Sequence, residues 1–151
     1  MADLGMLYQQ IILDHSKNPR HFQESPDLPC DKVCYNPLCG DSVHVYCAHE
    51  KGVITALTFT GEGCAISMAS ASLMAEALQG LPIEQARILF TWFIAMATAV
   101  DNDVPACPEY AKKLQILQGV RQFPMRVKCA TCAWHAFMGA LDNTAGSVKT
   151  E

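Results

Sequence analysis

The chain has 151 residues, half of them hydrophobic, and a formal net charge of -4 at pH 7. Its 11 lysines and arginines are scattered, which excludes the basic patch of a nucleic-acid-binding protein and the polybasic segment of a membrane-surface protein. A chain of this length buries its own core, so we expect one domain over residues 1–142 and a disordered tail over residues 143–151.

The eight cysteines would form a disulfide framework only in an oxidising compartment. The first six residues contain Asp3 and no basic or long apolar region, so no secretory signal is visible there and we expect a cytoplasmic protein. In that compartment, cysteines more often serve as metal ligands or reactive thiols. The apolar run over residues 88–100 is shorter than the ~20 residues of a membrane span and should form a buried helix.

The first third of the chain predicts a helix, a loop and a short strand. Apolar side chains at helical spacing indicate a helix over residues 4–16, which Asn18 and Pro19 end. Residues 22–29 are polar, contain proline and should form a loop. Residues 30–35 are expected to add an edge strand.

A β-hairpin follows this strand. Alternating side chains indicate strands over residues 42–48 and 53–60, joined by a turn at residues 50–52. A type I turn with Gly52 in the left-handed conformation would pair Cys47 with Thr55 and keep the apolar side chains of both strands on one face.

Extended by a few residues, the same register brings together groups that lie far apart in the sequence. It places Cys39 opposite Gly63 and next to Cys64, while Asp41 shares the parity of Cys39. Gly40 lets the chain bend between them. We therefore expect two thiols and a carboxylate to converge at one end of the hairpin.

The rest of the chain predicts a helix that has an apolar face over residues 66–77 and ends at Gly80, and further helices from Pro82 onward, from Pro108 to before Gly119, and over residues 128–141. Cys64 would then stand at the start of the first of these helices. Cys129 would lie in the first turn of the last one, beside Lys128. The positive end of a helix and a neighbouring cation both favour the thiolate, the form that binds metal or attacks sulfur.

Three thiolates and one carboxylate form a ligand set suited to tetrahedral zinc, and sulfur ligands also suit iron–sulfur clusters. The candidate ligands are Cys39, Asp41, Cys64 and Cys129. The single C-x-x-C formed by Cys129 and Cys132 is weak evidence by itself. The spacing alone leaves open whether these residues bind a metal or are buried structural cysteines.

Four stretches of sequence resemble the U-type iron–sulfur cluster assembly proteins. They read Y-x-x-I-I-L-D-H-x-K-N-P-R at residues 8–20, N-P-L-C-G-D at residues 36–41, G-E-G-C-A-I-S-M-A-S-A-S at residues 61–72 and F-P-M-R-V-K-C-A-T-x-A-W at residues 123–134. Their order and separation match the family as well. The resemblance implies an α+β fold, with a small antiparallel three-stranded sheet covered on one face by helices.

Within this family, the chain resembles the SufU branch more than the IscU branch. Lys128 stands where the IscU branch has a histidine, and residues 123–126 replace its chaperone-binding L-P-P-V-K, so recruitment of that chaperone is not expected. Residues 101–119 resemble an insertion of the SufU branch.

The resemblance implies a zinc site formed by Cys39, Asp41, Cys64 and Cys129. It also implies that the chain accepts persulfide sulfur from a cysteine desulfurase and passes it to downstream cluster assembly or acceptor proteins. Cys39, on a flexible turn, is the expected mobile ligand and nucleophile, and the protein would be at most a zinc-dependent sulfurtransferase. One alternative is a scaffold that binds iron and builds a [2Fe-2S] cluster. A second alternative is a structural zinc domain that binds a protein partner.

Three further residues are candidates for auxiliary roles. Cys132 stands where the family usually has an aliphatic residue, about one helical turn after Cys129, and could be an alternative ligand, a resolving thiol or a packing residue. Arg126 and Lys128 lie close enough in sequence to Cys129 to form a docking surface for an acidic partner, and the alternative is that both are solvated charges.

Overall fold

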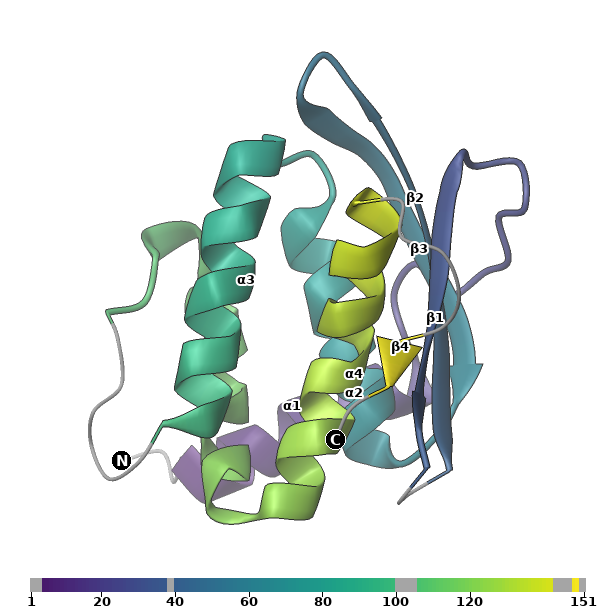
Figure 1. The fold of residues 1–151 in the computed structure, drawn as a ribbon. Coiled ribbons are helices and arrows are strands. Elements are labelled where there is room, and N and C mark those ends of the chain that lie inside the picture. Colours follow the sequence, from purple (N-terminus) through teal and green to yellow (C-terminus); the bar gives the residue numbers. More distant parts are fainter. Residues whose placement is uncertain (1–3, 38–39, 100–105, 143–147, 150–151) are drawn as a thin grey trace.

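The computed structural model describes residues 4–37, 40–99, 106–142 and 148–149. Its sheet contains three antiparallel strands, β1 (Cys30–Asn36), β2 (Asp41–Glu50) and β3 (Val53–Glu62). A two-residue strand, β4 (Val148–Lys149), runs parallel to β1 and completes the order β3-β2-β1-β4 (Figure 1). The predicted three-stranded antiparallel sheet is confirmed.

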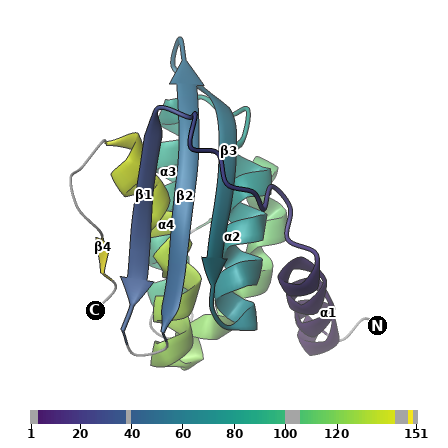
Figure 2. The ribbon, with the colours of Figure 1, turned by 90° about the vertical axis from the view of Figure 1, so that its right-hand side faces the viewer.

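The helices lie together on one face of this sheet (Figures 1 and 2). They are α1 (Leu4–Lys17), α2 (Ala65–Leu78), α3 (Ile83–Thr98), the 3-10 segment η1 (Glu109–Gln122) and α4 (Pro124–Leu141). α4 packs on β1 and β2, α2 packs on β3, and α3 and η1 form an outer layer against α4. This arrangement confirms the predicted α+β class. None of the helices in the described ranges is long and apolar enough to cross a membrane.

The hairpin register predicted from the sequence is wrong by two residues. The turn consists of Lys51 and Gly52 alone, and their φ angles of 53° and 77° are both positive. Two-residue turns with positive φ angles match the twist of the two strands that they connect. A bulge then inserts Thr55 into β3, and Cys47 pairs with Leu57. Because a shift of two residues preserves the side-chain parity, the apolar residues still face the helices.

The last two helical segments differ from the prediction at their ends. η1 continues past Gly119 to Gln122, and α4 begins at Pro124 instead of Lys128. Proline suits the first helical position because it has no N–H group that would need a partner there. The carbonyl of Phe123 accepts the N–H groups of the third and fourth residues of α4, at 2.8 and 3.1 Å. Cys129 therefore lies in the second turn of α4.

The tail is paired at two positions. Val148 and Lys149 pair with Cys34 and Tyr35 of β1, whose outer edge offers unpaired backbone groups. This pairing departs from the disorder expected over residues 143–151, of which 143–147 and 150–151 lie outside the described residues. The division into one domain and a tail stays a prediction.

A hydrogen-bonded aromatic cluster joins α2, α3 and α4. The Trp134 ring stacks on Phe93, with ring centroids 4.2 Å apart, and both side chains are fully buried. The indole N–H of Trp134 donates to the Ser70 hydroxyl at 3.1 Å, and this hydroxyl donates to the carbonyl of Ala130. Ser70 therefore gives the buried Trp134 N–H its partner and adds a second hydrogen bond to the Ala130 carbonyl, which joins α2 to α4.

α1 is attached to α2 through buried polar contacts. His15 is 1% exposed, and its Nδ1 lies 2.7 Å from the Ser72 hydroxyl oxygen. The same oxygen accepts the backbone N–H of Arg20 at 2.8 Å. These contacts fix the end of α1 and the residues that follow it against α2.

Ser70→Ala should destabilise the protein by about 1–3 kcal/mol, because it leaves the Trp134 indole N–H without a partner in the interior and removes the side-chain hydrogen bond to the Ala130 carbonyl. Thr91→Ala is the matched control. Thr91 is exposed and donates to the carbonyl of Arg87 in its own helix, so its loss should change the free energy of unfolding by no more than about 0.5 kcal/mol. Urea unfolding followed by circular dichroism measures both, and equal stability of the two variants would contradict this account.

Candidate metal centre

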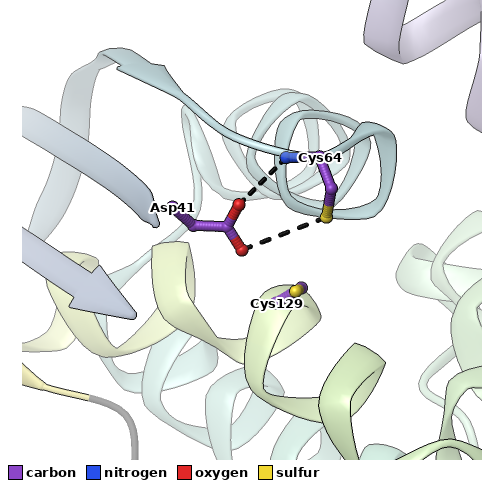
Figure 3. Close-up of side chains that lie close together, drawn as sticks. All are labelled: Asp41, Cys64 and Cys129. Atoms are coloured by element: carbon purple, nitrogen blue, oxygen red, sulfur yellow. Dashed lines mark hydrogen bonds between the residues drawn. The ribbon is translucent and has the colours of Figure 1, made fainter. Parts of the chain in front are cut away.

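Three candidate ligands converge where the sheet meets the starts of two helices. Asp41 is the first residue of β2, Cys64 precedes α2 and Cys129 lies in α4. One ligand atom from each lies within 4.8 Å of the others, and Figure 3 shows the carboxylate and both sulfurs around a common space. The predicted convergence of these three groups is therefore observed.

The Asp41 carboxylate is held in place by backbone. Asp41 is fully buried, and its Oδ1 accepts the N–H of Cys64 at 2.9 Å. A Cβ atom on Gly63 would overlap with this carboxylate, so the chain needs glycine there to bring β3 close to Asp41. A buried carboxylate needs such donors, because burial of an unpaired charge is very costly.

Cys64 is the N-cap of α2, as the sequence predicts. Its Sγ accepts the N–H of Ser67 at 3.4 Å and lies 4.0 Å from Oδ2 of Asp41. The residue is exposed, so its sulfur can be reached from outside. Sulfur at a helix N-terminus is well placed to carry negative charge, because the free N–H groups of the first turn point toward it.

The surroundings of Cys129 differ from those predicted. It is 2% exposed and lies in the second turn of α4, beyond the range in which the helix dipole acts on a side chain. Its Sγ instead accepts a hydrogen bond from Nδ2 of Asn36, at 3.8 Å. The sequence reasoning missed Asn36, although it opens the motif that contains Cys39 and Asp41.

Cys39 lies outside the described residues, as does its neighbour Leu38. Residues 37–40 connect β1 to β2, since Asn36 and Asp41 form the last pair of those strands. The structure thus describes three of the four predicted ligands, and the assignment of Cys39 as the fourth stays a prediction.

Two of the three candidate ligands border a cavity of about 560 Å³ between α1 and the starts of α2 and α4. Cys64 and Cys129 belong to its lining, and Leu13 and Met125, which are 51% and 46% exposed, contribute apolar walls. Arg126 also lines the cavity, and its guanidinium lies 4.6 Å from the centroid of the Phe123 ring. Lys128 is half-buried.

Cys132 is paired with Cys34 and does not join the three candidate ligands. Both residues are fully buried, and their thiols interact with each other. The interaction with Cys34 and burial raise the pKa of Cys132, and interactions with Asp41 and Cys129 raise it further. A second pair of buried thiols, Cys30 and Cys47, lies opposite one another on β1 and β2. Burial and then Cys30 raise the pKa of Cys47 to about 12.

The NifU-like N terminal domain is the family whose sequence pattern this chain matches, over residues 7–130. The chain belongs to this family. It is 38% identical over 135 residues to the "Zinc-dependent sulfurtransferase SufU" of Bacillus subtilis, covering 89% of each chain. It is 34% identical over 147 residues to the "Iron-sulfur cluster assembly scaffold protein IscU" of Streptococcus pyogenes, covering 97% of this chain and 90% of the relative.

The fold of this NifU-like domain also has a solved counterpart. It superposes with a TM-score of 0.80 on the N-terminal part of a NifU-like protein from Brucella abortus, at 21% identity, covering 91% of this chain and 96% of the other. The predicted family and its role in iron–sulfur cluster assembly are confirmed. The names of the relatives fit both predicted roles, sulfur transfer and scaffold.

The donors in this NifU-like domain fit a metal ion. Two sulfurs and a carboxylate oxygen form a zinc-type set, in which neighbouring ligand atoms lie roughly 3.8 Å apart in a tetrahedron. The present atoms lie within 4.8 Å, so small side-chain rotations bring them to that spacing. The exposed side of Cys64 leaves the site open toward the cavity.

Asp41→Asn should lower the affinity for zinc by at least about 10–100-fold, the loss typical of disturbing even an outer-shell partner. The asparagine amide oxygen can still accept a hydrogen bond from the Cys64 N–H, but it carries no negative charge that would attract the metal ion. Asp31→Asn is the control, because Asp31 is an exposed carboxylate on the neighbouring strand that pairs with His44 at 2.7 Å. Competition with a chromogenic chelator measures both affinities, and a matching loss in the control would contradict the role of Asp41.

Proposed function

We propose that this protein is a zinc-binding sulfur acceptor that takes persulfide sulfur from a cysteine desulfurase and passes it to the iron–sulfur cluster assembly machinery. The observation that carries the proposal is the convergence of Asp41, Cys64 and Cys129 beside an open, largely apolar cavity. A site with this opening suits exchange with a partner, whereas a structural zinc site is closed by protein ligands on all sides.

Cys39 is proposed as the fourth ligand and as the sulfur-accepting thiol. Zinc, when bound, keeps thiolates available at neutral pH without oxidising them. The Cys39 thiolate attacks the terminal sulfur of the persulfide on the desulfurase. The sulfur–sulfur bond of that persulfide breaks, the desulfurase cysteine leaves as a thiolate, and Cys39 becomes the persulfide.

The cavity is the proposed docking surface for the desulfurase. Its exposed apolar residues, Leu13 and Met125, offer contact area, and Arg126 offers a positive charge in the cavity that Cys64 and Cys129 also line. Lys128 adds a second cation on α4. We further propose that the reaction takes place in the cytoplasm, where thiols stay reduced.

Cys39→Ala should abolish the stimulation of desulfurase turnover by this protein and leave the basal rate of the desulfurase unchanged. Cys107→Ala is the matched control, since Cys107 is a half-buried cysteine whose thiol contacts the neighbouring Pro108 carbonyl. Alanine formation from cysteine measures turnover. Full stimulation by the Cys39→Ala protein would refute the proposed role of that residue.

The scaffold role is the second candidate, because the relative with 97% coverage of this chain carries that name. A carboxylate beside two cysteines also leaves room for exchange of the bound species, because oxygen is a harder ligand than sulfur. Anaerobic reconstitution with iron and sulfide distinguishes the two roles. A scaffold yields a visible chromophore that transfers to an apo-ferredoxin, whereas a dedicated sulfur acceptor stays colourless.

A further inference from the structure

Two thiols with no part in the proposed function lie directly behind the candidate metal centre. Cys34 in β1 and Cys132 in α4 are both 0% exposed, and the two thiols are close enough for Cys34 to raise the pKa of Cys132. Since α4 packs directly on β1, this interaction joins two elements of the interior. Neighbouring thiols need only a short approach to form a disulfide.

Cys132 is also a neighbour of the ligand Cys129. The two residues are three positions apart in α4, so their side chains lie side by side on the helix. In a regular helix their Cα atoms are about 5 Å apart, inside the range found for disulfides. Their Cβ atoms must approach by about 1–2 Å, which a local adjustment of one helical turn provides.

Access to the buried pair runs through Cys129. Cys129 lines the open cavity together with Cys64, whereas Cys34 and Cys132 have no exposed surface. Of the thiols of Cys129, Cys132 and Cys34, Cys129 is therefore the one that a sulfur-bearing partner in the cavity can reach. The three thiols of Cys129, Cys132 and Cys34 form a path from the cavity into the interior.

We propose that Cys34 and Cys132 form a redox-active dithiol that reduces sulfur carried on Cys129 to sulfide. This inference rests on the proposed function, which loads persulfide sulfur onto Cys39, and it adds one transfer in which the Cys129 thiolate attacks the outer sulfur of that persulfide and Cys39 leaves as a thiolate. It adds an activity to that function, because the protein would then release sulfur in the oxidation state in which clusters contain it.

The reaction proceeds by two thiol–disulfide exchanges. In the first, the Cys132 thiol loses its proton and attacks the inner sulfur of the Cys129 persulfide. A Cys129–Cys132 disulfide forms, and the outer sulfur leaves as hydrosulfide, which takes up the proton. In the second, the Cys34 thiol loses its proton and attacks the Cys132 sulfur, so that a Cys34–Cys132 disulfide forms and Cys129 leaves as a thiolate.

The sum is balanced without any outside oxidant. One persulfide and two thiols give one thiol, one hydrogen sulfide and one disulfide. The sulfane sulfur is reduced by two electrons, and the Cys34–Cys132 pair is oxidised by two. Each reduced chain therefore delivers one sulfide, and an external dithiol reductant must reopen the disulfide before the next.

The molecule contains an internal control for this proposal. Cys30 and Cys47 form a second buried thiol pair. They are 9% and 1% exposed and lie opposite one another on β1 and β2. That pair lies at the other end of β1 from Asn36, roughly 20 Å away at the rise of a β-strand. If buried thiols had only a packing role in this protein, the Cys34–Cys132 and Cys30–Cys47 pairs should respond to a persulfide in the same way.

The test uses the purified, metal-containing protein with all thiols reduced and small thiols removed under anaerobic conditions. One equivalent of glutathione persulfide is added, the sample is alkylated under denaturing conditions, and peptide mass spectrometry maps disulfides and persulfides. Sulfide is captured with monobromobimane. The chain should yield the Cys34–Cys132 disulfide and about one sulfide per molecule.

The variants separate the two exchanges. Cys34→Ala should stop at the Cys129–Cys132 disulfide and still release sulfide, whereas Cys132→Val should retain the persulfide on Cys129 and release at least about tenfold less sulfide. Because these variants accumulate different species, a general folding defect cannot imitate both. Cys30→Ala should behave like the unsubstituted protein.

The proposal is overturned if Cys34 and Cys132 stay reduced in the unsubstituted protein, or if their disulfide forms equally well in Cys129→Ser. Failure of a desulfurase to load sulfur onto the protein, with normal disulfide formation from glutathione persulfide, would refute the proposed function alone. Loading by the desulfurase without formation of the Cys34–Cys132 disulfide would refute the dithiol alone.

Discussion

The hydrogen bond from the Cys64 N–H to the Asp41 carboxylate is the contact on which the site depends. It ties the first residue of β2 to the residue that caps α2, and it is possible only because Gly63 has no side chain. It supplies a partner for a fully buried negative charge, which would otherwise be strongly destabilising. Both candidate ligands are therefore oriented by the fold, which would limit the conformational entropy lost when a metal binds.

The packing of the helices holds the third candidate ligand, Cys129, near this pair. The stacked rings of Phe93 and Trp134 and the hydrogen bonds of Ser70 hold α4 against α2, and so hold Cys129 near Cys64. α1, attached to α2 by His15, supplies the opposite wall of the cavity. The candidate ligands are thus held by tightly packed helices, while the cavity beside them stays open. This combination suits a protein whose chemistry takes place with a partner.

The cysteines fall into groups with different surroundings. Cys64 and Cys129 face the cavity, Cys34 and Cys132 interact with each other in the interior, and Cys30 and Cys47 lie opposite one another near the far end of β1. Among these described cysteines, Cys129 and Cys132 lie side by side in α4 and link the first two groups. The proposed dithiol therefore lies beside the candidate metal centre and is reached through Cys129.

The sequence by itself determined most helices and strands, the family and the grouping of Asp41 with Cys64 and Cys129. It could do so because the alternation of polar and apolar side chains, the helix-capping residues and the family motifs are local properties of the chain. It did not determine the hairpin register, since the primed turn at Lys51 and the bulge at Thr55 depend on how the strands twist. It placed Cys129 at a helix end because Pro124 was taken as a separator, although proline is also a good first residue of a helix. Only the tertiary structure decided that Asn36 contacts Cys129 and that Cys132 meets Cys34, because these contacts join segments separated by about a hundred residues that pack together only in the folded sheet and helices.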